Sequence, residues 1–289
     1  MAKRSHRPLE YVMNILFMAA TAVSIIAVGL ICWFVFSTAI PTMAKIGFGD
    51  FLFGSLWKPT QDLYGILPMI VGSLYVTLGA GLIGVPVGIL TAVFMVFYCP
   101  KSIKQYVQAG INLLAGIPSV VFGLWALESI VPLIRSRFGG FGLSILAAMI
   151  LLGIMILPTV ITLSESAIQA VPEAYYQGAI GLGASKERAI FTVVIPAAGS
   201  GVLASVVMGV GRAIGETMAV QMVIGNAPIF PKGLASMGRT LTTNITTEMA
   251  YAGGLHREAL IATGAVLFVF ILVINLIFNV IKNSSKKGD

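Results

Sequence analysis

Long blocks of apolar residues dominate this sequence and decide its class. A helix needs roughly 20 apolar residues to cross about 30 Å of hydrocarbon. Six blocks reach that length, at residues 12–40, 67–98, 107–134, 143–163, 202–224 and 259–281. Only 10% of the 289 residues are charged, too few to cover a soluble domain. The sequence predicts an all-α integral membrane protein with six transmembrane helices.

The first block follows Lys3, Arg4 and Arg7, so it has two interpretations. A cleaved secretory signal has an apolar core of about 7–15 residues. The block at 12–40 is much longer than that, which favours an uncleaved first span.

The distribution of basic residues predicts the orientation of the chain. With the N-terminus inside, ten Lys and Arg residues lie on the inner side and seven on the outer side. This bias follows the positive-inside rule and predicts that both termini are cytoplasmic. The net charge of +7 then indicates topology and contact with anionic lipid rather than nucleic acid. The inner residues are Lys3, Arg4, Arg7, Lys101, Lys104, Lys186, Arg188, Lys282, Lys286 and Lys287, and the outer ones are Lys45, Lys58, Arg135, Arg137, Lys232, Arg239 and Arg257.

Several chemistries find no support in the sequence. It contains no G-x-x-x-x-G-K-[ST] phosphate loop, so we expect no ATP hydrolysis by this chain. Cys32 and Cys99 should lie at different depths, which argues against a disulfide. His6 and His256 fall on opposite sides of the membrane and build no metal site. We expect no catalytic residue, metal or cofactor in this chain.

Small residues recur every four positions at Gly201, Ser205 and Gly209. This spacing puts them on one face of a helix, where small side chains let another helix approach closely. The pattern predicts a packing face in the fifth span.

The longest inner loop, at about residues 164–200, mixes polar and apolar residues. Pro172 suits the first turn of a short helix, Gly181 and Gly183 can end it, and Ser185 can cap a second helix. The loop is either an ordinary connector or a helical hairpin that a partner protein or the membrane surface covers.

Arg212 and Glu216 stand in the fifth block, four residues apart. That spacing predicts one helical face and an ion pair. A lone charge at mid-membrane costs about 2.5–3.5 kcal/mol on insertion scales. The pair either fixes helix packing or lines a transport pathway, where the planar guanidinium suits a tetrahedral oxyanion.

The inner loop resembles the cytoplasmic loop of ABC importer permeases, whose motif reads E-A-A, three residues, G, nine residues and I-x-L-P. Ala179, Gly183 and Pro196 match the motif, whereas Gln177 replaces its Glu and Gly178 its first Ala. The resemblance implies that this loop docks in a cleft of a cytoplasmic ATPase. The docking residues it implies are Glu173, Gln177, Gly178, Ala179, Gly183, Ala184, Ser185 and Pro196.

The segment G-R-A-I-G-E-T-M-A-V at 211–220, followed by Gly225-Asn226, resembles the PstC-type permeases of phosphate ABC importers. Trp57-Lys-Pro59 also fits that subfamily. The resemblance implies a substrate pathway along Arg212, Glu216 and Thr217.

The same resemblance implies a MetI-like core at 69–282, with the coupling loop at 164–200 inside it. Residues 1–68 would hold a cytoplasmic tail, an extra first helix and an extracytoplasmic loop, and residues 283–289 a cytoplasmic tail. The implied partners are a homologous PstA-type permease, two ATPase subunits that use ATP, and an extracytoplasmic phosphate-binding protein. The implied location is the plasma (inner) membrane of a bacterium or archaeon.

Two other functions fit the sequence. One is a permease for another oxyanion, such as sulfate or molybdate. The other is a membrane anchor or sensor subunit that recruits a cytoplasmic partner and moves no solute.

Overall fold

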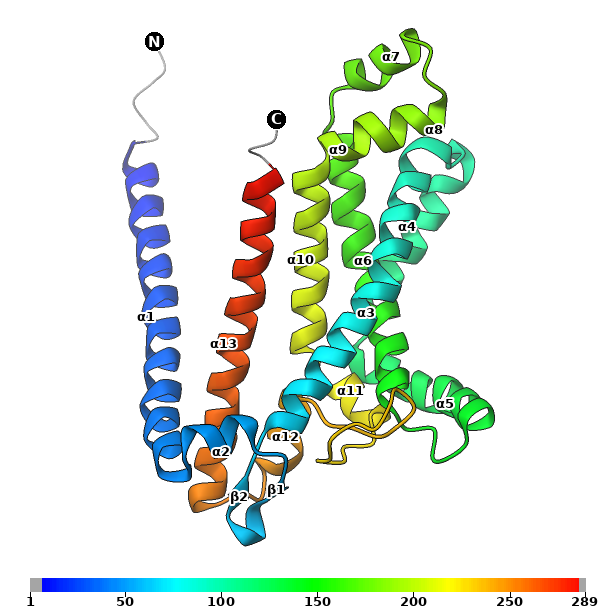
Figure 1. Cartoon of the computed structure of the whole chain (residues 1–289). Helices are drawn as coiled ribbons and strands as arrows, with labels where there is room; N and C mark the ends of the chain where they lie inside the picture. The colour runs from blue at the N-terminus through cyan, green and yellow to red at the C-terminus, as the bar shows by residue number, and fades with distance from the viewer. Residues whose placement is uncertain (1–6, 286–289) are drawn as a thin grey trace.

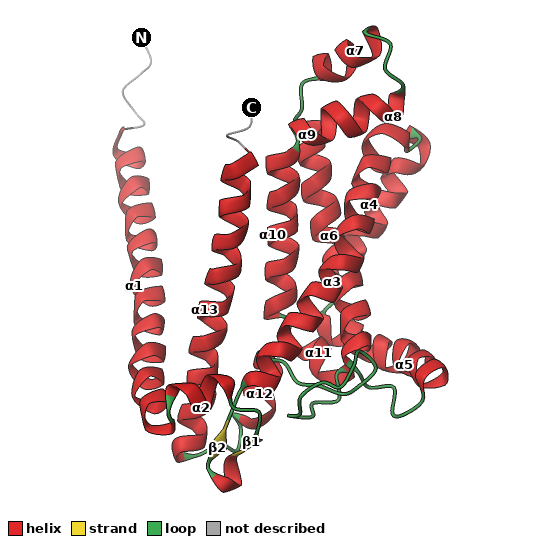
Figure 2. Ribbon diagram, viewed as in Figure 1, coloured by secondary structure: helices red, strands yellow, loops and turns green. Residues whose placement is uncertain are grey.

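The computed structural model describes residues 7–285 and is a helical bundle with one short β-ribbon (Figures 1 and 2). The first half of the described chain contains α1 (Arg7–Ile46), α2 (Phe48–Phe53), β1 (Trp57–Lys58), η1 (Pro59–Gln61), β2 (Leu63–Tyr64), α3 (Leu67–Val93), η2 (Phe94–Tyr98), α4 (Lys101–Gly116) and α5 (Ser119–Phe138). The second half contains α6 (Ile145–Gln169), α7 (Glu173–Gly181), α8 (Lys186–Ala189), η3 (Ile190–Val194), α9 (Ile195–Ala197), α10 (Gly199–Gly215), α11 (Met218–Val223), α12 (Leu241–Glu248) and α13 (Gly254–Ser285).

The membrane class is confirmed by the length and composition of these helices. Five helical segments among the described residues are long and apolar enough to cross a bilayer. A sixth span is obtained if α10 is taken together with the helical segment Lys186–Ala197, from which it is bent by 72°. The predicted second, fourth and sixth spans correspond to α3 with η2, to α6 and to α13. The chain is a multi-pass membrane protein.

The third apolar block, 107–134, forms two helices, and the break lies at Gly116 and Pro118, the two residues of the block that interrupt a helix. The helix is interrupted between α4 and α5. At this point Ile117 has an extended backbone (φ −70°, ψ 127°) and is followed by Pro118. The proline ring clashes with a helical conformation of the preceding residue, and proline has no N–H to continue the helix. Of the two pieces, only α5 is both long and apolar enough to span the membrane, since α4 has 16 residues.

The centre of the bundle is the contact between α3 and α6, which glycine makes close. A Cβ at Gly84 would lie 2.5 Å from the carbonyl oxygen of Gly153. The predicted small-residue face of α10 also packs on α6. The Ser205 hydroxyl lies 2.7 Å from that of Ser164, and a Cβ at Gly209 would meet Val160 at 2.8 Å. That prediction is confirmed.

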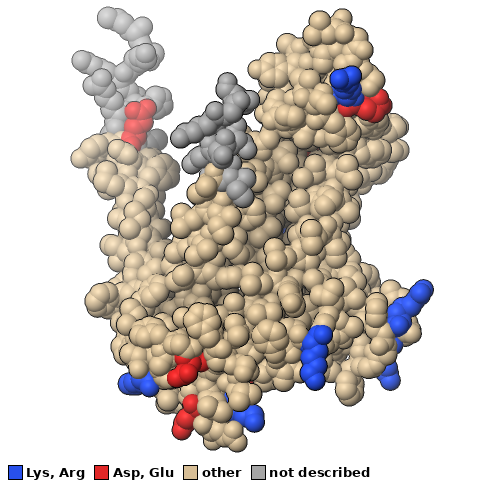
Figure 3. All heavy atoms as spheres, in the orientation of Figure 1, with Lys and Arg blue, Asp and Glu red and all other residues tan. Residues whose placement is uncertain are grey.

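The two ends of the bundle differ. The start of α1, the end of α13 and the α7–α8 segment lie at one end, and the β1–β2 ribbon lies at the other, which we call the ribbon end (Figure 1). On the face drawn in Figure 3, charged side chains gather at both ends and leave an uncharged belt between them. Lys3, Arg4, Lys286 and Lys287 lie outside the described residues. A belt of this kind is what hydrocarbon requires of a protein surface.

Candidate functional site

The fifth predicted span, 202–224, is broken where its charged residues lie. Helix α10 ends at Gly215, Glu216 has an extended backbone (φ −69°, ψ 127°), and α11 starts at Met218. The hydroxyl of Thr217 donates to the carbonyl oxygen of Gly215 at 3.1 Å. The hydroxyl of Thr242, from α12, donates to the carbonyl oxygen of Glu216 at 3.4 Å. These contacts satisfy backbone carbonyls that the lost helical turn leaves open.

The predicted ion pair between Arg212 and Glu216 is wrong. Among residues 7–285, no salt bridge joins these two side chains. The i,i+4 argument requires a continuous helix, and the break at Glu216 removes that geometry.

Each charge is instead placed at the helix end that favours it. Arg212 lies in the last turn of α10, where the partial charge of the carbonyls is negative. The Glu216 carboxylate accepts the backbone N–H of Ala219 at 3.3 Å, in the first turn of α11. The structure thus compensates the two charges separately.

Arg212 consequently keeps donors available for a ligand. Its side chain is exposed in this chain, and its one hydrogen bond to the described residues goes from Nη1 to Thr159 Oγ1 at 3.4 Å. An exposed guanidinium in an apolar span must face a water-filled cavity or another polypeptide, because contact with lipid would cost several kcal/mol.

The α7–α8 segment forms the predicted helical hairpin. Pro172 precedes α7, Gly183 adopts a left-handed backbone (φ +86°), and the Ser185 hydroxyl caps α8 by accepting the N–H of Arg188 at 3.3 Å. Leu182 at its tip is 93% exposed, and α7 has no buried residue. Within α7, Gln177 donates to the Glu173 carboxylate at 3.1 Å. Tyr176 packs on Phe97 with 5.4 Å between ring centroids, and most other side chains of α7 are exposed.

The hairpin starts later than predicted. Helix α6 continues to Gln169, so the first residues of the predicted 164–200 loop belong to a span. Glu165 is buried there and pairs with Lys104 of α4 at 3.1 Å, while Gln169 donates to it at 2.9 Å. These polar residues tie α4 to α6 and do not belong to the hairpin.

Helix α8 is fastened to the end of the second span. Lys186 Nζ donates to the carbonyl oxygen of Phe97 at 2.7 Å and lies 4.0 Å from the ring centroid of Tyr98. Beneath it, Ile190 and Val194 pack with Val93 in a buried cluster. These contacts join α8 and η3 to the α3–η2 span.

Comparison with known proteins now decides the family. The profile of the family described as "Binding-protein-dependent transport system inner membrane component" matches residues 84–287. The chain belongs to this family. Its members are transport components, which agrees with the absence of any catalytic motif in the sequence.

Three relatives of this transport component show its place in the family. The "Probable ABC transporter permease protein YqgH" of Bacillus subtilis is 41% identical over 78% of this chain and 76% of the relative. The "Phosphate transport system permease protein PstC" of Mesorhizobium japonicum is 32% identical over 89% of this chain and 84% of the relative. The "Probable phosphate transport system permease protein PstC" of Methanocaldococcus jannaschii is 31% identical over 86% and 85%.

Solved structures confirm the predicted fold of the transport component. A chain of the inward-facing MetNI methionine ABC transporter has a TM-score of 0.63 at 18% identity and covers 80% of this chain and 99% of its own. A chain of a bacterial alginate ABC transporter has the same score at 17% identity, with coverage of 96% and 99%. At such identities the similarity shows the fold alone.

The structure also reveals a polar cluster that the sequence did not predict. The buried Arg239 donates through Nε to the carbonyl oxygen of Asn226 at 2.8 Å and through Nη1 to Asn244 Oδ1 at 2.9 Å and to Glu248. The second carboxylate oxygen of Glu248 accepts Trp57 Nε1 at 2.8 Å and lies 2.8 Å from His256 Nε2. We call Trp57, Arg239, Asn244, Glu248 and His256 the ribbon-end cluster.

Glu248 is the centre of the ribbon-end cluster, and its titration reflects this. Burial alone would raise the pKa of Glu248, but hydrogen bonds from Trp57, Arg239 and His256, with the charge of Arg239, outweigh it and lower the pKa below its ordinary value. Trp57 and Glu248 are 191 residues apart, so no local pattern could have paired them.

Proposed function

We propose that this chain is the permease subunit of an ATP-driven, binding-protein-dependent phosphate importer and forms part of its translocation path. The observation that carries the proposal is Arg212, an exposed guanidinium within an apolar span at a break in the helix. Its family membership and its similarity to phosphate permeases of a bacterium and an archaeon support the same function.

The break gives phosphate a route for recognition without tight binding. The planar guanidinium of Arg212 can offer two parallel N–H donors to two oxygens of one phosphate. Glu216 and Thr217 lie in the break that follows α10. There the Glu216 carboxylate repels an anion that approaches too closely. A transport site must release its substrate as well as bind it, so an anion site bordered by a carboxylate suits conduction.

The α7–α8 hairpin is the docking element for an ATPase in this proposal. Its residues Glu173, Gln177, Gly178, Ala179, Gly183, Ala184 and Ser185, with Pro196 beyond it, enter or border the ATPase cleft. The exposed apolar side chain of Leu182 lies at the tip of the hairpin, and its burial in the ATPase cleft favours docking. ATP-driven movement of the hairpin reaches the membrane through Lys186 and the α3–η2 span.

The complete importer then contains this chain, a homologous permease, two ATPase subunits and an extracytoplasmic phosphate-binding protein. The chain binds no cofactor, and ATP is used by the ATPase subunits. In this proposal, the MetI-like permease domain extends from residue 69 to residue 282. The chain lies in the plasma membrane of a bacterium or archaeon. Both termini are in the cytoplasm, the side on which the hairpin meets the ATPase.

The test is ATP-driven uptake of radiolabelled phosphate into vesicles that contain the complete complex. Uptake that requires both ATP and the binding protein supports the proposal. Uptake of sulfate or molybdate in place of phosphate would assign another oxyanion, and a complex that assembles but moves no anion would indicate an anchor or sensor subunit.

A further inference from the structure

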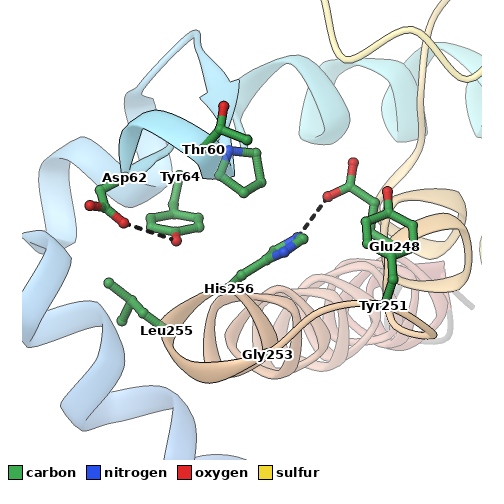
Figure 4. A pocket seen from close by; sticks show the side chains of 9 residues that line it. Thr60, Asp62, Tyr64, Glu248, Tyr251, Gly253, Leu255 and His256 are labelled. Carbon is green, nitrogen blue, oxygen red and sulfur yellow. Dashed lines mark hydrogen bonds and ion pairs between the residues drawn. The ribbon is translucent and has the colours of Figure 1, made fainter.

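A second site lies at the ribbon end, far from the hairpin. A pocket of about 520 Å³ opens there between the β1–β2 ribbon and the turn that joins α12 to α13 (Figure 4). We call it the ribbon pocket. It is lined by Pro59, Thr60, Asp62, Tyr64, Glu248, Tyr251, Gly253, Leu255 and His256.

The lining of the ribbon pocket has one sign of charge. It contains two carboxylates, Asp62 and Glu248, and no Lys or Arg. The charge of Glu248 is neutralised by its salt bridge with the buried Arg239. Asp62, in contrast, is exposed and accepts one hydrogen bond, from the Tyr64 hydroxyl at 3.4 Å. Asp62 is therefore the carboxylate that a ligand meets, and it makes the pocket unsuitable for phosphate.

Aromatic rings form the walls of the ribbon pocket. The ring centroids of Tyr64 and Tyr251 lie 6.3 Å and 6.1 Å from that of His256. Tyr251 is 69% exposed, so its ring is available for contact from outside. Aromatic faces attract Lys and Arg and also accept their aliphatic stems. A carboxylate beside such faces selects a cation that has an apolar stem.

The surroundings of the pocket restrict what can approach it. Other charged side chains at the ribbon end are mainly basic on the face drawn in Figure 3. Lys58 of the ribbon and Arg257, next to His256, are both exposed. A free cation gains little from approaching such a surface. An acidic protein surface that carries one protruding basic side chain complements both the basic surroundings and the pocket.

We propose that the ribbon pocket receives a lysine or arginine side chain of the extracytoplasmic phosphate-binding protein and thereby fixes where that protein docks. This inference rests on the proposed function, because it requires such a protein to bind this end. The backbone of Asp62 supports the arrangement. Its left-handed conformation (φ +53°) turns the ribbon sharply after η1 and presents the carboxylate beside Tyr64.

The test uses the complete complex in lipid nanodiscs, titrated with phosphate-loaded binding protein while ATP hydrolysis is measured. Asp62→Asn keeps the size and the left-handed backbone of the residue but removes the charge. We expect it to raise the half-saturating concentration of binding protein roughly tenfold, with the maximal rate unchanged. Tyr251→Leu should raise it several-fold, since a ring face is lost and apolar surface is kept.

The matched control is Asp50→Asn, which removes an exposed carboxylate of α2 outside the pocket. It should leave the half-saturating concentration unchanged. If Asp62→Asn and Tyr251→Leu also leave it unchanged, the ribbon pocket is not a docking site. If the wild-type complex does not respond to the binding protein at all, the proposed function fails first, so the two failures are distinguishable.

Discussion

Arg212 carries most of the functional argument at the scale of single residues. Its type and position in an apolar block were apparent from the sequence, but its environment was not. The sequence predicted a neutral pair with Glu216, and the structure separates the two charges by ending α10 between them. The separation strengthens the functional interpretation, because an internally paired guanidinium would have fewer donors to offer.

Arg212→Gln should lower phosphate uptake roughly 10- to 100-fold, because a hydrogen bond to a charged group is worth about 1.5–3 kcal/mol. Vesicle uptake measured with equal amounts of assembled complex checks this. Arg137→Gln, which removes an exposed arginine from the last turn of α5, is the control and should transport normally. Normal phosphate uptake by Arg212→Gln would contradict a role for Arg212 in the translocation path.

Glu248→Gln should destabilise the ribbon end by roughly 3 kcal/mol, because removing one partner of a buried pair leaves Arg239 uncompensated. Thermal unfolding of the purified chain in detergent measures this loss. Glu187→Gln, at an exposed carboxylate of α8, should change stability by less than about 1 kcal/mol. Equal unfolding temperatures for the two variants would contradict the central role of Glu248.

The stability of the wild-type ribbon end should also depend on pH. The pKa of Glu248 is lower in the folded chain than its ordinary value of 4.5. Its stabilisation is therefore fully present above about pH 4.5 and is lost as the pH falls through the folded pKa. Glu248→Gln should remove this part of the acid dependence, and an acid unfolding profile identical to wild type would exclude Glu248 as its source.

At the scale of elements, the sequence predicted the continuous apolar helices and the break at Pro118, but it did not predict the break at Glu216. Helices α3, α6 and α13 follow from length and hydropathy alone, and the second span has its predicted ends, Leu67 and Tyr98. Pro118 gave a local reason to expect a break, whereas Glu216 gave none. At that break, the N–H of Ala219 is a local partner of the Glu216 carboxylate, whereas the contact with Thr242 of α12 is supplied only by the folded chain.

The close contact of α3 with α6 gives a test at this scale. Gly84→Ala should cost roughly 1–3 kcal/mol, because its Cβ would meet the rigid backbone of Gly153. Gly81→Ala on the same helix meets only Val210 at 3.9 Å and should be neutral or slightly stabilising. Thermal unfolding in detergent compares them, and equal stability would refute the close packing.

The hairpin gives a second pair of glycines. Gly183→Ala forces a Cβ into a left-handed backbone, which costs about 1–2 kcal/mol and displaces the turn before α8. We expect several-fold less phosphate transported per ATP hydrolysed. Gly181→Ala stays helical, meets nothing within 4 Å and should leave coupling intact. Unchanged coupling in Gly183→Ala would argue against a docking role for the hairpin.

At the scale of the whole molecule, helix α1 stands beside the rest of the bundle and leaves much apolar surface uncovered (Figure 1). Helix α1 contacts the bundle mainly through α13, for example through Phe36 against Phe268 at 5.8 Å between ring centroids. In the proposed importer, lipid and a second permease cover the remaining apolar surface, and the exposed Arg212 faces the translocation path between the two permeases. Composition predicted the membrane environment, but the division of that surface between lipid and partner is set by the assembly.

The most direct test of the central claim is radiolabelled uptake by the complete complex with phosphate and sulfate offered separately, with and without ATP. We predict ATP-dependent uptake of phosphate and none of sulfate. A complex that hydrolyses ATP in response to its binding protein but imports sulfate instead, or imports neither anion, would contradict the account.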